Sequence, residues 1–80
     1  MGMIYSITEM QILNDGNSAC TSLLKTREEA EKVVRDTADS YKRDYDYWDV
    51  LEEEGEPLSK LVVGDPDGEY VEFTIRQHEV

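Results

Sequence analysis

The feature that most constrains the fold is a turn signal near the N-terminus, Asn14-Asp15-Gly16-Asn17, which has strand-forming residues on both sides. Residues 3–13 are rich in β-branched and aromatic side chains, which favour extended backbone. Adjacent Asn, Asp and Gly are typical of the tight turn between two antiparallel strands. We therefore predict a β-hairpin, with a first strand over residues 3–13 and a return strand over residues 18–25.

A helix is predicted to begin directly after this hairpin, at Thr26-Arg27-Glu28-Glu29. These residues have the form of a capping box, in which the Thr26 hydroxyl accepts a hydrogen bond from the Glu29 amide and the Glu29 carboxylate accepts one from the Thr26 amide. Farther along, apolar residues recur every three or four positions, which is the spacing of one stripe along a helix. The stripe consists of Val33, Val34, Ala38, Tyr41, Tyr45, Trp48 and Leu51.

The end of this helix has two interpretations. Gly55 and Pro57 are a typical stop signal, because glycine tolerates the left-handed conformation and proline cannot continue the helical hydrogen bonds. A single helix up to this signal would have about 28 residues and a length of about 42 Å. That is long for a chain of 80 residues. The alternative is a break near Asp44, with residues 45–53 as an irregular segment or an additional strand.

A second hairpin is predicted after the helix. Its first arm covers residues 58–63 and ends at a turn signal over residues 64–68, where proline and glycine suit the turn dihedrals. In the return arm, Val71, Phe73 and Ile75 alternate with polar residues, which is typical of a strand with one buried side. The predicted fold class is α+β in the order β-β-α-β-β, an antiparallel sheet of about four strands with one long helix packed across one face.

The chain is predicted to form one small domain over residues 1–80, because no repeat or linker divides it. A domain of this size buries only about 60% of the surface that its unfolded chain exposes, so its stability margin is small. Met1 and Gly2 are interpreted as a cloning remnant, because Met3 offers a second start.

The charge of the chain excludes several classes of partner. The formal net charge is −11, from 19 acidic and 8 basic side chains, which opposes direct binding of nucleic acid or of an anionic membrane. No apolar run approaches the roughly 20 residues of a transmembrane helix. Cys20 is the only cysteine, so no internal disulfide can form. These features predict a soluble cytoplasmic protein.

The sequence shows no pattern of residues typical of catalysis or metal binding. His78 is the only histidine and is expected to be an exposed residue at a strand end, and Cys20 is expected to be a small packed side chain. Asp65 and Asp67 resemble part of a calcium loop, but the remaining ligands are missing and a plain turn favours the same residues. We therefore predict no catalytic residue, no cofactor, no metal and no enzymatic activity.

The largest side chains of the predicted helix gather in its second half. Strands of seven or eight residues cover only about 25 Å, so a helix of about 42 Å would extend beyond the sheet. If the helix bends, or if the sheet is wider than four strands, these side chains join the core; otherwise they form an interface with a second copy or another protein. The candidate interface consists of Tyr41, Tyr45, Tyr47, Trp48 and Leu51.

The same region is strongly acidic, with eleven acidic and five basic residues between Thr26 and Glu54. Carboxylates at the C-terminal end of a helix oppose its macrodipole, so local stability does not explain Glu52, Glu53 and Glu54. The acidic residues either keep the protein soluble or imitate nucleic-acid phosphates. The candidate acidic surface consists of Asp36, Asp39, Asp46, Asp49 and Glu53.

Three functions are compatible with these features. The first is a non-enzymatic protein-interaction or regulatory module that forms a homodimer through the aromatic residues or contacts another protein. The second is an acidic nucleic-acid mimic or inhibitor that binds a basic protein surface. The third is a small ligand-binding protein or enzyme whose site forms only at a subunit interface.

Overall fold

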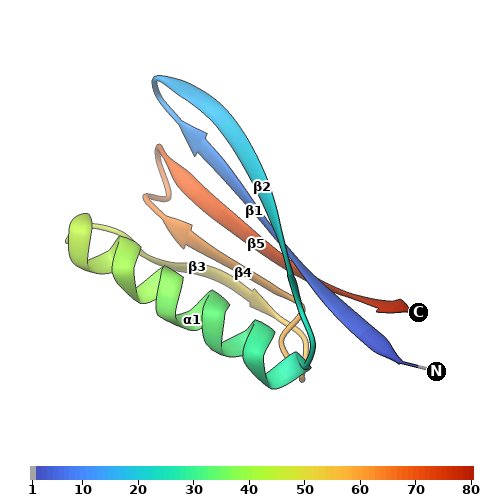
Figure 1. The fold of residues 1–80 in the computed structure, drawn as a ribbon. Helices are drawn as coiled ribbons and strands as arrows, with labels where there is room; N and C mark the ends of the chain where they lie inside the picture. Colours follow the sequence, from blue (N-terminus) through green and yellow to red (C-terminus); the bar gives the residue numbers. More distant parts are fainter. Residues whose placement is uncertain (1) are drawn as a thin grey trace.

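The structure, a computed structural model, describes residues 2–80. These residues form one helix and one antiparallel sheet of five strands, in which the spatial order of the strands is β2-β1-β5-β4-β3. Along the chain the elements are β1 (Met3–Leu13), β2 (Gly16–Leu24), α1 (Arg27–Asp44), β3 (Asp49–Glu54), β4 (Lys60–Gly64) and β5 (Tyr70–Glu79). Figure 1 shows α1 lying across one face of the sheet, on the side of β4 and β3 rather than β2. The predicted α+β class is therefore confirmed, with five strands in place of about four.

The first hairpin forms as predicted. Leu13 pairs with Gly16, so Asn14 and Asp15 make a turn of two residues. Gly16 has a φ of +144°, a value that residues with a side chain rarely adopt, which explains why glycine follows the turn. β2 begins two residues earlier than predicted and ends at Leu24 instead of Lys25. The interpretation of Met1 as part of a cloning remnant lies outside the described residues.

The start of α1 is confirmed at the predicted cap. Thr26 has extended backbone dihedrals, and its Oγ1 accepts a hydrogen bond from the Glu29 amide at 3.1 Å. The other half of the cap differs from the prediction, because the Glu29 carboxylate accepts a hydrogen bond from the Thr26 hydroxyl, at 3.3 Å, rather than from the Thr26 amide. The cap therefore satisfies the Glu29 amide, which has no partner within the helix.

The helix ends earlier than the single-helix interpretation required. α1 has 18 residues and ends at Asp44, and its length is about 27 Å. The long helix is therefore wrong, and the alternative break near Asp44 is confirmed, with β3 as the additional strand. Lys42 and Arg43 occupy the last turn of α1, where their positive charges interact favourably with the helix dipole. A helix that continued to Glu54 would have had carboxylates in its last turn instead. Gly55, with a φ of +90°, lies in the connection from β3 to β4.

The hydrophobic core lies between α1 and the central strands. Three helix residues at a spacing of four, Ala30, Val34 and Ala38, are buried against the sheet. Val71 and Phe73 of β5 are almost fully buried, as their alternation predicted, whereas Val33 of the predicted stripe is 40% exposed. The buried core consists of Ile7, Ala30, Val34, Ala38, Trp48, Leu58, Leu61, Val63, Val71, Phe73 and Ile75.

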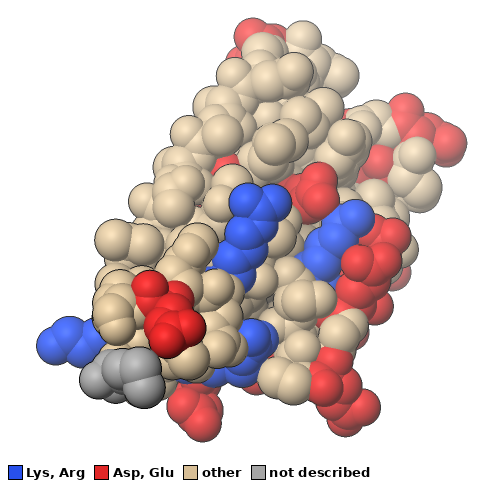
Figure 2. Space-filling view, turned by 90° about the vertical axis from the view of Figure 1, so that its right-hand side faces the viewer, with Lys and Arg blue, Asp and Glu red and all other residues tan. Residues whose placement is uncertain are grey.

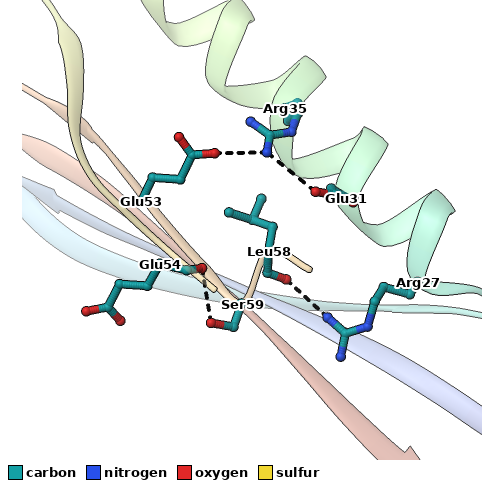
Figure 3. Close-up of polar contacts among 7 residues, drawn as sticks. All are labelled: Arg27, Glu31, Arg35, Glu53, Glu54, Leu58 and Ser59. Carbon is teal, nitrogen blue, oxygen red and sulfur yellow. Dashed lines mark hydrogen bonds and ion pairs between the residues drawn. The ribbon is translucent and has the colours of Figure 1, made fainter. Parts of the chain in front are cut away.

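Polar contacts attach α1 to β3 and to the segment that follows it, as Figure 3 shows. The Arg35 guanidinium lies between two carboxylates and donates to Glu53 at 2.9 Å and to Glu31 at 3.4 Å. Arg27 donates to the Leu58 carbonyl at 3.1 Å. These contacts hold β3 beside the helix, at the edge of the sheet. Among residues 2–80, no helix is long and apolar enough to cross a membrane.

Candidate interaction surface

The strand β2 forms one edge of the sheet and is exposed along nearly its whole length. Its nine residues, from Gly16 to Leu24, include neither a charged residue nor a proline. Natural proteins usually protect a sheet edge with charges, proline, a bulge or a covering element, because an unprotected edge pairs readily with other strands. None of residues 16–24 is charged or a proline, and α1 comes near β2 only at the end of the strand, where the helix begins (Figure 1).

The alternation of hydrogen bonds across the sheet shows which β2 residues direct their backbone groups outward. At the end of the β1–β5 pair, the Gly2 amide donates to the Val80 carbonyl at 3.4 Å and the Val80 amide donates to the Gly2 carbonyl at 3.0 Å. Along two antiparallel strands, opposite residues alternate between hydrogen-bonded and non-hydrogen-bonded pairs. Because the Gly2–Val80 pair is hydrogen-bonded, the even-numbered β1 residues bond to β5 and the odd-numbered ones bond to β2. Odd-numbered β1 residues lie opposite even-numbered β2 residues, so the even-numbered β2 residues form the hydrogen bonds to β1. Asn17, Ala19, Thr21 and Leu23 therefore direct their amides and carbonyls away from the sheet.

The side of the β1–β2 hairpin that faces away from α1, which we call the open face, is also uncharged. Leu23 is 62% exposed there, and Met10 of β1 is 41% exposed. In Figure 2 the upper part of the molecule, which is the turn end of the hairpin, is mostly tan, whereas red side chains gather lower and at the right. The open-face residues of the hairpin are Ile4, Ser6, Thr8, Met10, Ile12, Asn17, Ala19, Thr21 and Leu23.

The opposite edge of the sheet, β3, has the protection that β2 lacks. Four of its six residues are acidic, namely Asp49, Glu52, Glu53 and Glu54. Its pairing with β4 is interrupted by a register shift at Leu51, and a bulge of this kind bends an edge away from further pairing. The two edges therefore differ in charge and regularity, and β2 is the edge suited to contact with another strand.

The structure separates the members of the predicted aromatic interface. Trp48 is 4% exposed and belongs to the core, with Tyr45 stacked on it at a centroid distance of 4.6 Å and Tyr41 at 5.7 Å. Because α1 ends at Asp44, Tyr45, Tyr47 and Trp48 do not lie on a helix that extends beyond the sheet. Tyr47 is 60% exposed and Leu51 is 39% exposed. An interface through the exposed members, Tyr45, Tyr47 and Leu51, stays a prediction.

A hydrogen-bonded group that the sequence did not indicate joins the last turns of α1 to β1. The Tyr41 hydroxyl donates to Glu9 at 2.9 Å and accepts from the Gln11 side chain at 2.7 Å, and Gln11 also donates to Glu9 at 2.8 Å. Burial, and then the neighbouring Glu9 carboxylate, raise the pKa of Tyr41 to about 12. The hydroxyl therefore remains protonated and acts as a structural contact rather than as a base. Alternation along a strand places Glu9 and Gln11 on one face, but only the fold brings Tyr41 to them.

The predicted acidic surface is partly neutralised. Asp36 pairs with Lys32 at 2.6 Å, and Glu53 pairs with Arg35 at 2.9 Å. Glu53 and Asp39 line a groove of about 300 Å³ between α1 and β3, together with Arg35 and Lys42, so this groove has mixed charge. Asp39, Asp46 and Asp49 are exposed and take part in no ion pair among residues 2–80.

A wider groove, of about 580 Å³, lies over β4 and the turn from β4 to β5. Leu51, Val62 and Tyr70 contribute its apolar lining. Lys60, its one basic lining residue, pairs with Glu52 at 2.8 Å and with Glu72 at 3.5 Å. The hydrogen bond to Glu52 is the main cause that raises the pKa of Lys60. Because this lysine is already paired with two carboxylates, the groove offers little to attract an anionic ligand.

The remaining polar residues that the sequence singled out do not form a reactive group. His78 is exposed in β5, as expected, and its Nε2 lies 2.8 Å from the Ser6 hydroxyl, a contact that the sequence did not indicate. Cys20 is exposed rather than packed, because β2 is an edge strand. Asp65 accepts from the Asp67 amide at 3.0 Å, as in a plain turn. Among residues 2–80, no group of three or more His, Cys, Asp or Glu side chains is arranged to hold a metal ion.

Comparison of the chain with protein-family models, with curated proteins and with solved structures gave no match. The feature that separates this chain most clearly from an ordinary small α+β domain is the uncharged, unprotected edge of β2.

Proposed function

We propose that this chain is a non-enzymatic protein-interaction module that binds an extended segment of another protein along the edge of β2. The observation that carries the proposal is the contrast between the two sheet edges. β2 has no charge among its nine residues, whereas four of the six β3 residues are acidic and β3 contains a bulge. An added strand would pair with the outward amides and carbonyls of β2, which is the recognition mode known as strand addition.

The chemistry of this surface suits an extended segment better than a small molecule. Asn17, Ala19, Thr21 and Leu23 offer backbone donors and acceptors at every second position along the strand. The exposed Leu23 and Met10 side chains on the open face add apolar contact beside that line. Backbone pairing supplies affinity with little dependence on sequence, and contacts to the side chains supply selectivity.

The proposal moves the interface from the place that the sequence suggested. The predicted aromatic interface depended on Trp48, which is 4% exposed and stacks with both Tyr41 and Tyr45. A buried Trp48 offers almost no surface to a partner. The β2 edge is therefore the better supported contact, and Tyr45, Tyr47 and Leu51 are a secondary surface.

A nuclear magnetic resonance titration with a strand peptide tests the proposed function. The probe is an uncharged peptide of alternating threonine and valine, as long as β2, which has nine residues, and it is added in large excess so that it displaces any strand already paired with β2. We expect chemical-shift changes at the amides of Asn17, Ala19, Thr21 and Leu23, because these amides point away from the sheet and would donate to the added strand. The amides of β3 should change little, because its carboxylates and bulge disfavour pairing.

The control is the same peptide with methyl groups on alternate backbone nitrogens, which removes the donors on one edge and blocks pairing there. This peptide has the same side chains, so loss of the response would show that backbone pairing causes it. Equal responses to both peptides, or changes spread over α1 and β3 instead of β2, would contradict the proposed function.

The second candidate function is the acidic mimic, which is favoured by three exposed carboxylates, Asp39, Asp46 and Asp49, that form no ion pair among residues 2–80. This function predicts binding of a basic peptide such as oligo-lysine that weakens steeply from low to high salt, because exposed charges are screened. Replacement of the three aspartates with asparagine should weaken the binding several-fold at low salt. Binding that is insensitive both to salt and to these replacements would eliminate the mimic.

A further inference from the structure

We propose that the segment bound by β2 is the β2 strand of a second copy of this chain, in an antiparallel pair centred on Cys20. This inference rests on the proposed function and names its partner. Two copies related by a two-fold axis perpendicular to the sheet would form one continuous antiparallel sheet, with their α1 helices on the same side. Hydrogen-bond register, charge and the position of Cys20 all favour this pairing.

The register follows from the outward-pointing residues. In an antiparallel pair, outward residues must lie opposite outward residues to exchange hydrogen bonds. With the two-fold axis at Cys20, Ala19 lies opposite Thr21 of the second copy and Asn17 lies opposite Leu23 of the second copy. All the outward residues of β2 are then paired, and the strand overlaps its partner from Gly16 to Leu24. A centre at Ala19 or Thr21 shortens this overlap.

Charge complementarity favours the same register. Asp15 precedes β2 and Lys25 follows it, both are exposed, and neither takes part in an ion pair among residues 2–80. With the axis at Cys20, Asp15 of each copy lies opposite Lys25 of the other, so each end of the interface has one aspartate facing one lysine. A centre at Ala19 or Thr21 removes this match.

The charge of the whole chain explains why β2 is the edge for self-association. Each copy has a formal net charge of −11, so two copies repel each other over most of their surfaces. Contact through β3 would oppose one row of carboxylates to another, because Asp49, Glu52, Glu53 and Glu54 lie in that strand. Contact through β2 brings together strands that carry no charge.

The proposed register makes Cys20 a reporter of the dimer. Cys20 would lie opposite Cys20 of the second copy in a non-hydrogen-bonded pair, in which Cα atoms are about 4.5 Å apart. A disulfide requires Cα atoms less than about 7 Å apart. Cys20 is exposed, so a reagent can reach it in the free chain.

The experiment is oxidation of the reduced full chain with diamide, followed by separation on a non-reducing gel and measurement of the solution mass of the unoxidised protein. When the disulfide forms, the two thiols lose two protons and two electrons, and diamide takes them up and becomes the corresponding hydrazine. We expect a dimer by mass and rapid crosslinking of nearly all chains. The matched control is Cys20→Ser with Ser18→Cys, which moves the thiol by two residues on the same face of the strand. The thiols of that variant would be separated by about 13 Å along the strands and should crosslink slowly.

Charge reversal tests the register independently of the disulfide. Asp15→Lys should slow crosslinking roughly tenfold, because two attractive pairs become repulsive. The double variant Asp15→Lys with Lys25→Asp should restore it, because the match is re-established with the signs exchanged. Circular dichroism of each variant checks that the fold is retained.

The outcomes separate this inference from the proposed function. A chain that is monomeric by mass, or a dimer in which the Ser18→Cys variant crosslinks as fast as Cys20, would overturn the paired β2 strands. If the monomer still responds to the strand peptide at Asn17, Ala19, Thr21 and Leu23, the proposed function stands and its partner is another protein. If the monomer does not respond to that peptide either, both the inference and the proposed function fail.

Discussion

Replacement of Trp48 with alanine is expected to lower the free energy of unfolding by about 3–5 kcal/mol. Trp48 is 4% exposed and packs against both Tyr41 and Tyr45, so its removal leaves a large cavity in the core. A domain of this size has a total stability of only about 5–10 kcal/mol, so much of the variant would be unfolded at moderate denaturant. Urea denaturation followed by circular dichroism measures the effect.

Tyr47→Ala is the matched control, because Tyr47 is also a large aromatic residue of the same segment but is 60% exposed. Its effect on stability should stay within about 0.5 kcal/mol, as for most surface positions. If Trp48→Ala instead kept the stability of the parent chain and changed only its solution mass, Trp48 would be an interface residue and its place in the core would be wrong.

Replacement of Gly64 with alanine is the second change with a large expected effect. A Cβ atom at this position would lie 2.5 Å from the Glu69 carbonyl oxygen and 2.5 Å from the Tyr70 Cα. Both are backbone atoms, and Gly64 is paired with Tyr70 in the sheet, so neither strand can yield without loss of the β4–β5 pairing. We expect the free energy of unfolding to fall by about 1–3 kcal/mol or more, measured by thermal or urea denaturation.

Gly68→Ala is the control for Gly64→Ala, since both glycines flank the same turn. A Cβ atom on Gly68 would meet only the Asp65 side chain, at 3.5 Å, which is an ordinary contact. This variant should differ from the parent by no more than about 0.5 kcal/mol. Equal losses of stability in the two variants would contradict the close approach of β4 and β5 at Gly64.

The elements with strong local signals were predictable from the sequence. The Asn14-Asp15 turn, the Thr26 cap and the alternation of Val71, Phe73 and Ile75 each depend on residues close together in the chain, and each is present in the structure. Local hydrogen bonding and side-chain periodicity cause these features directly, so no knowledge of the tertiary fold was needed.

The segment from Tyr45 to Glu54 was harder to predict, because its apolar residues continue the helical spacing. Burial of Trp48 in the core, which is a tertiary effect, takes precedence over that spacing. One local signal did favour the correct result: a helix that ends after Lys42 and Arg43 has positive charge at its C-terminus, whereas one that continues to Glu54 does not.

The candidate site could not be predicted, because it depends on the order of strands in the sheet. β1 pairs with β5, so Met3 lies opposite Glu79 and the first and last strands of the chain lie side by side. This pairing between distant segments places β2 at an edge and leaves Cys20 exposed. Sequence periodicity identifies strands but does not show which strand lies at the edge of a sheet.

The most direct test of the β2 edge compares two variants at one position, Ala19→Pro and Ala19→Val, in the strand-peptide titration. Proline removes the outward amide while the hydrogen bonds from β2 to β1 remain, and edge strands tolerate proline at such positions. Valine keeps the amide and enlarges the side chain. We predict that Ala19→Val retains the chemical-shift changes at Asn17, Thr21 and Leu23 and that Ala19→Pro loses most of them. Equal responses of the two variants would show that the β2 backbone is not the binding surface and would contradict the account.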